Sequence, residues 1–180
     1  GPKVTIDSAT LMNKALEVIE AHWLFGLPSK RIETLVHPQS LVHSFVEFVD
    51  GSVVAQLGPP DMRTPIQYAL TWPRRAAGCS RRMDWATLGS MDFEPVDHDT
   101  FPSVRMAGQV IDTGGTAGAI FNAANEVAVE AFLAGSISFG QIFECVASAV
   151  DSIPAGHVGS LEDVMAADGA ARAHVVDRVH

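Results

Sequence analysis

The chain has 180 residues, 47% of them hydrophobic, which is enough to bury a core in one large domain or two small ones. No apolar run approaches the ~20 residues of a membrane span, and no signal peptide opens the chain, so we expect a soluble, cytoplasmic protein. The net charge of -9, without basic residues interleaved with aromatic ones, argues against a nucleic-acid-binding surface.

The chain opens with a predicted short strand over residues 1–7, followed by a helix. Ser8 and Thr10 are favourable N-cap residues, and Gly26 suits the end of the helix. Apolar residues recur between these signals at the four- and three-residue spacing of one buried helix face: Met12, Leu16, Ile19 and Trp23.

A polar stripe accompanies that apolar face. Asn13, Lys14 and Glu17 lie one and three residues apart, which brings an amide, an ammonium and a carboxylate together. The free N–H groups of a first helical turn favour an anion, so Ser8, Asn13 and Lys14 could bind a phosphate, while Glu17 could ligate a hard cation. The alternative is an ordinary surface ion pair between Lys14 and Glu17.

A small sheet is predicted next. Residues 31–37 and 40–49 alternate as strands, and Asp50-Gly51 indicates a type I′ hairpin that returns along residues 52–57. Both faces of these strands are partly apolar. We therefore expect the sheet to be covered by the first helix on one side and by another surface, such as a second subunit, on the other.

A proline-rich loop over residues 58–65 leads into a short helix over 66–72, with Pro65 in its first turn. Residues 73–90 have the composition of a linker, and residues 91–95 could form a short strand. Four arginines in this stretch have no aromatic residues interleaved among them and are better explained by a solvated linker than by a binding patch: Arg74, Arg75, Arg81 and Arg82.

The rest of the chain is predicted to be helical, over residues 101–111, 116–134, 139–153 and 160–180. Ser160 and Asp163 form a capping-box-like pair at the last start. The short connections imply antiparallel neighbours and hence a small bundle. Polar residues within 122–126 are expected to make interhelical hydrogen bonds rather than a site.

Charge also divides the chain. Residues 1–82 hold nine Lys or Arg and seven Asp or Glu, whereas residues 83–180 hold three and fourteen. We therefore expect an α+β fold in which residues 1–82 form a small sheet and β-hairpin packed on helices, residues 83–100 a linker, and residues 101–180 a C-terminal α-helical bundle. Cys79 and Cys145 are distant and predict neither a disulfide nor a metal site.

Several segments resemble, in family order, those of 1-deoxy-D-xylulose 5-phosphate reductoisomerases. They are Asp7-Ser-Ala-Thr-Leu-Met-Asn-Lys-Ala-Leu-Glu17, His37-Pro-Gln-Ser40, Val42-His-Ser44, Asp50-Gly-Ser52, Gly58-Pro-Pro-Asp-Met-Arg-Thr-Pro65 and Asn122-Ala-Ala-Asn-Glu126. The resemblance covers almost the whole chain. It implies an NADPH-dependent oxidoreductase and isomerase of non-mevalonate isoprenoid biosynthesis, which converts 1-deoxy-D-xylulose 5-phosphate to 2-C-methyl-D-erythritol 4-phosphate.

The resemblance also implies roles for individual residues. Ser8, Asn13 and Lys14 would bind the substrate phosphate and adjoining hydroxyls, and Glu17 would be the catalytic metal ligand for Mn²⁺ or Mg²⁺. Two further residues would contact NADPH: Gly1, which matches the glycine at the end of a mobile flap, and Met62, beside the nicotinamide. From its sequence alone, Met62 could equally fill a gap in the core.

Two histidines lie in predicted strands. His37 adjoins a proline turn and is expected to be structural. His43 matches a family histidine near the active site, and we assign it a supporting role because the sequence shows no partner that would tune its pKa.

The family places its NADPH-binding domain, its flap and two more metal carboxylates before the position of Gly1, and the chain contains no Gly-x-Gly-x-x-Gly. We therefore expect this chain to be the C-terminal part of such an enzyme, part of a homodimer, and inactive alone. The alternative is a non-catalytic module for sugar-phosphate binding or dimerisation.

Overall fold

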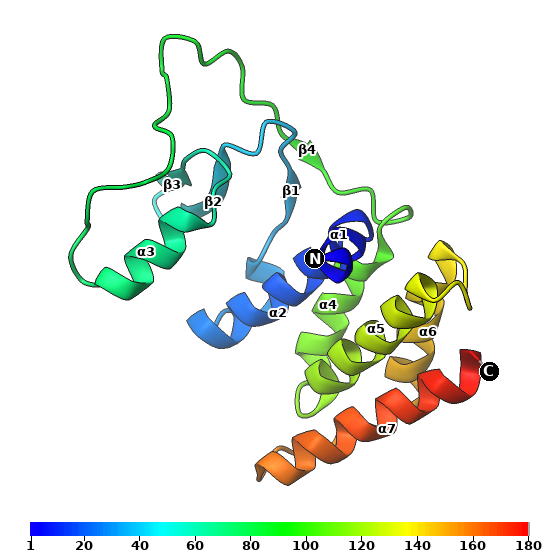
Figure 1. Cartoon of the computed structure of the whole chain (residues 1–180). Coiled ribbons are helices and arrows are strands. Elements are labelled where there is room, and N and C mark those ends of the chain that lie inside the picture. Colours follow the sequence, from blue (N-terminus) through cyan, green and yellow to red (C-terminus); the bar gives the residue numbers. More distant parts are fainter. Residues whose placement is uncertain (180) are drawn as a thin grey trace. The chain divides into compact units, whose positions relative to one another are not determined.

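The computed structural model describes residues 1–179, and their internal contacts divide the chain into two units. One unit contains Gly1–Thr34 and the chain from Val96 onward, and the other contains Leu35–Pro95. The first is helical and the second carries the strands, so the predicted α+β class is confirmed (Figure 1). The domain boundaries expected at residues 82 and 100 stay a prediction, because this division describes internal contacts alone.

The helical unit confirms the predicted bundle. Helix α5 lies against both α6 and α7, and α2 lies against α4. The four helices predicted after residue 100 are found within one or two residues of their expected bounds; the last predicted position, 180, lies outside the described residues. The helices are α1 (Pro2–Ala9), α2 (Met12–Phe25), α4 (Pro102–Thr113), α5 (Ala117–Leu133), α6 (Phe139–Ser152) and α7 (Leu161–Val179), with a 3₁₀ turn η1 (Ser29–Arg31) after α2.

Side chains cap the starts of the last two helices. Before α7, the Ser160 N–H donates to Asp163 Oδ2 at 2.8 Å, and the Ser160 hydroxyl accepts from the Asp163 N–H at 3.3 Å. Ser138 and Gln141 form the same reciprocal pair at α6. These bonds satisfy backbone groups that a helix start leaves free, which explains why the helices begin where the sequence pattern predicts.

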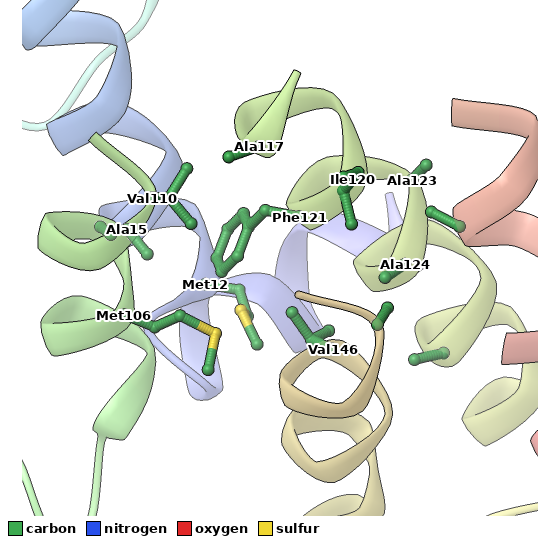
Figure 2. Packing of buried hydrophobic residues seen from close by; sticks show 14 of the residues in the cluster. Met12, Ala15, Met106, Val110, Ala117, Ile120, Phe121, Ala123, Ala124 and Val146 are labelled. Atoms are coloured by element: carbon green, nitrogen blue, oxygen red, sulfur yellow. The ribbon is translucent and has the colours of Figure 1, made fainter. Parts of the chain in front are cut away.

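The core of the helical unit is continuous across its helices (Figure 2). Phe121 of α5 is fully buried and lies among side chains that include Met12 of α2, Val110 of α4 and Val146 of α6. Burying a side chain of this size is worth roughly 1.5–3 kcal/mol relative to exposing it. Helix α2 contributes Met12, Ala15, Val18 and Ile19 to the core that α4, α5 and α6 complete, whereas Trp23 of the predicted apolar face is 67% exposed, so that part of the prediction is wrong.

The start of the chain differs from its prediction. Residues 1–7, expected as a strand, lie in helix α1, which has Pro2 in its first turn. The helical spacing lets Lys3 pair with Asp7 at 2.5 Å, and it lets the Ser8 hydroxyl donate to the Val4 carbonyl at 2.8 Å. The alternation of Val4 and Ile6 is too short a pattern to distinguish a strand from a helix. The helix is held at its end by the buried carboxylate of Asp7.

The second unit contains β1 (Leu35–Val36), β2 (Val42–Glu47), β3 (Val53–Leu57), α3 (Arg63–Thr71) and β4 (Glu94–Pro95). Strands β2 and β3 form the predicted antiparallel hairpin, with a register shift between Val42 and Ser44. Strands β1 and β4 form a separate antiparallel pair. The strand expected over residues 31–37 is thus shorter than predicted, because η1 occupies its first residue.

The hairpin turn is not of type I′. That turn needs positive φ at both central residues, whereas Gly51 (φ 81°) has positive φ and Asp50 does not. The Gly51 N–H bonds to the Phe48 carbonyl, and the Phe48 N–H bonds to the Ser52 carbonyl, each at 2.9 Å. This is the pattern of a three-residue loop that ends in a left-handed glycine.

No helix among residues 1–179 combines the length and the apolar character needed to span a bilayer. Cys79 and Cys145 are both free thiols, in agreement with the expectation that they form no disulfide.

Candidate functional site

The predicted site residues of the helical unit flank the turn between α1 and α2. Ser8 lies in the last turn of α1, and Asn13, Lys14 and Glu17 lie in the first two turns of α2. The single helix expected from Ser8 onward is therefore two helices, separated by Thr10 and by Leu11, whose backbone is left-handed (φ 54°, ψ 18°).

The structure brings three of these side chains together. Asn13 Nδ2 donates to Glu17 Oε1, and Lys14 Nζ donates to Glu17 Oε2, both at 2.5 Å. The Lys14 and Glu17 side chains are 40% and 46% exposed, so their pairing contributes at most about 1 kcal/mol to stability. The ion pair foreseen as the ordinary explanation is thus present. It also holds an ammonium, an amide and a carboxylate at one accessible position, where an incoming anion or cation could replace the weak internal bonds.

Ser8 is not bonded to the other three residues. Its hydroxyl donates to Val4 within α1, and its expected role as a helix N-cap is wrong. The N-cap position of α2 is Leu11, and it is the Thr10 hydroxyl that accepts the Met12 N–H at 3.3 Å. Thr10 therefore satisfies a free backbone N–H in the first turn of α2. Ser8 cannot do so, because α1 continues to Ala9 before the chain turns.

The cluster of Asn13, Lys14 and Glu17 provides one carboxylate that could bind a metal, rather than a complete metal site. Among residues 1–179, no group of three or more His, Cys, Asp or Glu side chains could hold a metal ion. Glu17 has an accessible carboxylate of the kind that Mg²⁺ and Mn²⁺ accept, so it fits as one ligand of a set completed by other groups.

The two predicted cofactor contacts lie in different units. Gly1 is exposed, and a Cβ added to it would meet nothing within 4 Å. Met62 is 71% exposed at the start of α3, so the alternative that it fills a gap in the core is wrong. Its neighbours Asp61 and Arg63 form an ion pair, and the hydrogen bonds from Arg63 hold the pKa of Asp61 far below its usual value. Met62 thus lies between the two members of an exposed ion pair.

The histidines differ in their surroundings. His37 Nδ1 lies 2.8 Å from the Asp92 carbonyl, and its ring stacks on Phe93 at 4.5 Å between centroids, as expected of a structural residue. His43 is exposed on β2. Its proposed supporting role stays a prediction.

Helix α5 makes the interhelical bonds expected of residues 122–126. Arg172 of α7 bonds to Glu126 at 2.5 Å and to Asp168 at 2.7 Å, and these two carboxylates raise the pKa of the guanidinium. Asn125 Nδ2 donates to Asp7 Oδ1 at 2.9 Å. Neither Asp7 nor Asn125 was predicted to form such a pair, although a carboxylate and an amide inside apolar helix faces were a signal for it.

Two family models match the chain. One, described as the DXP reductoisomerase C-terminal domain, matches residues 57–174, and the other, described as the 1-deoxy-D-xylulose 5-phosphate reductoisomerase C-terminal domain, matches residues 1–25. The second match includes all four site residues of α1 and α2.

Relatives named 1-deoxy-D-xylulose 5-phosphate reductoisomerase match over nearly the whole chain. The protein from Symbiobacterium thermophilum is 56% identical over 96% of this chain and 44% of its own length. The protein from Methylobacillus flagellatus is 51% identical over 98% of this chain and 45% of its own. The chain therefore spans less than half the length of these relatives.

Solved structures agree with the relatives. The reductoisomerase from Zymomonas mobilis in complex with NADPH has a TM-score of 0.93 and 47% identity, over 99% of this chain and 47% of that one. A DOX-P reductoisomerase in complex with NADPH, fosmidomycin and magnesium has a TM-score of 0.93 and 40% identity, over 99% of this chain and 46% of that one.

Proposed function

Because the chain belongs to the 1-deoxy-D-xylulose 5-phosphate reductoisomerase family, we propose that it forms the C-terminal part of such an enzyme. The proposed reaction is the NADPH-dependent rearrangement and reduction of 1-deoxy-D-xylulose 5-phosphate to 2-C-methyl-D-erythritol 4-phosphate. The observation that carries the proposal is the accessible cluster of Asn13, Lys14 and Glu17 inside a segment that matches the family model.

We assign phosphate binding to Ser8, Asn13 and Lys14. Lys14 supplies a full positive charge, and its one side-chain hydrogen bond to residues 1–179 is the exposed one to Glu17, which a phosphate oxygen can replace. Asn13 and Ser8 add neutral donors beside the start of α2, where backbone N–H groups also favour an anion. These residues hold the substrate in place, and positioning of this kind is a large part of catalysis.

We assign to Glu17 the role of the metal ligand that this chain supplies. Its carboxylate would bind Mg²⁺ or Mn²⁺ together with ligands from outside the described residues. A bound divalent cation polarises the carbonyl and hydroxyl oxygens of a substrate. Metal binding by Glu17 and substrate binding by Asn13 and Lys14 both compete with the bonds among these three side chains, so each would favour the other.

We assign two contacts with NADPH. Gly1 leaves room for a close backbone approach to the cofactor, and the exposed Met62 offers an apolar surface to the nicotinamide ring. Both residues are accessible in this chain, as contact with a separate cofactor requires.

A second candidate function, a non-catalytic sugar-phosphate-binding or dimerisation module, has support from the hairpin. Several of its apolar side chains are about half exposed or more, including Val46, Phe48 and Val54. Such a surface suits a second copy of the chain, and we propose a homodimer in either case. The two functions differ in whether Lys14 and Glu17 affect turnover.

The test of phosphate binding is Lys14→Ala in the full-length enzyme. Losing a charge-assisted bond of about 1.5–3 kcal/mol should raise KM for the phosphorylated substrate roughly tenfold to a hundredfold, with little change in KM for NADPH. The matched control is Lys30→Ala, which removes an exposed lysine of η1. Equal kinetics for the two variants would reject the assignment.

The test of metal binding is Glu17→Gln, with Glu20→Gln on the same helix as its control. A neutral amide is a poorer ligand for a hard cation, so the Glu17 variant should need much more metal for half-maximal activity. Its melting temperature should change little, because the side chain is exposed. A normal metal titration in the Glu17 variant would show that this residue only forms an ion pair.

A further inference from the structure

The turn between α1 and α2 is held in an unusual backbone conformation. Leu11 is left-handed with φ 54°, a conformation that a non-glycine residue keeps only where its surroundings hold it. The turn separates Ser8 from Asn13 and Lys14. Its geometry therefore decides how the last turn of α1 faces the first turn of α2.

Two hydrogen bonds reach this turn from distant helices. Asn125 of α5 donates to the Asp7 carboxylate at 2.9 Å, across 118 residues of sequence. The Ser103 hydroxyl of α4 donates to the Thr10 carbonyl at 2.9 Å, across 93 residues. Asn125 is 0% exposed and Ser103 is 1% exposed, so both donors are shielded from solvent; the Asn125–Asp7 bond is buried and the Ser103–Thr10 bond is partly buried.

These bonds act on both sides of the turn. Asp7 directly precedes Ser8, and Thr10 directly precedes the left-handed residue from which α2 starts. Asp7 is itself 3% exposed, and its second oxygen is bonded by Lys3. The turn is thus fixed to α5 at one end and to α4 at the other.

Asn125 is a polar side chain in an apolar part of the core, and its bond to Asp7 satisfies a buried carboxylate. The Asn125 Oδ1 is buried and has no hydrogen-bond partner, and a buried polar atom without a partner is unfavourable. Its neighbours on α5, Ala124 and Ala128, are fully buried apolar residues. An amide in this place is less favourable for packing than an apolar side chain, but it offers a directional bond to Asp7.

We propose that Asn125 and Ser103 are positioning residues that hold the α1–α2 turn, and so orient Ser8 relative to Asn13, Lys14 and Glu17 for binding the substrate phosphate and the metal. The inference rests on the proposed function. Neither residue contacts the substrate; each acts through the backbone that carries the contacts.

The test compares Asn125→Ala with Asn122→Ala in the full-length enzyme. Asn122 lies on the same helix and bonds to Glu126 rather than to the turn. Misplaced binding groups should raise KM for the ketose phosphate about tenfold or more in the Asn125 variant, and less than about twofold in the control. KM for NADPH should stay the same in both, measured well below their melting temperatures.

Exchanging the amide and the carboxylate between positions 125 and 7 tests whether substrate binding can be rescued. Asn125→Asp alone places two carboxylates against each other and should give the largest increase in KM. Adding Asp7→Asn restores one donor and one acceptor, and should recover part of the loss. Ser103→Ala should raise KM in the same direction.

Amide hydrogen exchange supplies a readout that does not depend on turnover. Residues 8–14 should exchange faster in the Asn125→Ala variant than in the Asn122→Ala control. If exchange and KM are alike in the two variants, or if exchange changes while KM does not, the positioning role is wrong. If Lys14→Ala is itself silent, it is the proposed function that fails, and the inference fails with it.

Discussion

The two units of the chain differ sharply in packing. The helical unit has a continuous core in which Phe121 and Met12 are fully buried, whereas no side chain among residues 35–95 is classed as buried. The proposed substrate and metal residues lie in the helical unit, on a helix whose apolar face belongs to the core. The exposed Met62 lies in the other unit. A well-packed helix suits residues that must be held in place, while the exposed apolar side chains of the second unit suit contacts with other molecules or chains.

The largest effect expected concerns activity of the 180-residue chain alone. It should fold, because the helical unit has its own core, yet it should not oxidise NADPH in the presence of the ketose phosphate. One metal carboxylate and a phosphate site do not supply the positioning and electrostatic stabilisation that act together in catalysis. Circular dichroism would follow folding and NADPH absorbance would follow turnover, with the full-length enzyme as control. Turnover near that of the control would contradict the assigned residues.

The difference in packing is tested by Phe121→Ala and Phe45→Ala. Phe121 is 0% exposed, and its truncation should lower the free energy of unfolding by about 3–5 kcal/mol. Phe45 is 45% exposed, and its truncation should cost less than about 1 kcal/mol. Denaturant unfolding followed by the helical signal measures the first loss, and hydrogen exchange of the hairpin amides measures the second. Similar losses would show that the second unit is packed more tightly than its exposure indicates.

Two glycines provide a matched backbone test. Gly115 of the helical unit has φ 53°, and an added Cβ would lie 2.1 Å from the Gly156 carbonyl oxygen. Gly51 of the hairpin has φ 81°, with nothing within 4 Å of an added Cβ. Gly115→Ala should therefore destabilise by more than about 2 kcal/mol, and Gly51→Ala by about 1–2 kcal/mol within the hairpin only. Thermal unfolding and exchange of the hairpin amides would separate these effects.

The smallest effect expected is a pH dependence. Hydrogen bonds from the Gly159 and Ser160 backbone lower the pKa of Asp163, and bonds from Ser52 lower the pKa of Asp50. A lowered pKa in the folded state means that each carboxylate stabilises above its ordinary pKa, and that this contribution is lost as pH falls below about 4. Asp163→Asn should weaken the acid sensitivity of helical unfolding below about pH 4, and Asp50→Asn should not. Equal changes would indicate that the hairpin and the helices unfold together.

Much of this architecture was accessible from local sequence patterns. Periodic apolar residues and cap signals such as Ser160 with Asp163 predicted the helices after residue 100, and Asp50-Gly51 predicted the hairpin. The spacing of Asn13, Lys14 and Glu17 predicted a cluster that the structure contains. These features depend on residues a few positions apart, so a short stretch of sequence specifies them.

The tertiary structure decided the rest. Residues 1–7 are a helix, Ser8 does not cap α2, and the chain turns at a left-handed Leu11. All three features lie beside hydrogen bonds to residues distant in sequence: Asn125 donates to Asp7, and Ser103 donates to Thr10. The sequence by itself indicated which residues could form the proposed phosphate and metal site and which segments after residue 100 would be helical. Only the folded core determined how those residues face one another. The hydrogen bonds that hold them join residues 118 and 93 positions apart, and no local sequence pattern predicts such bonds.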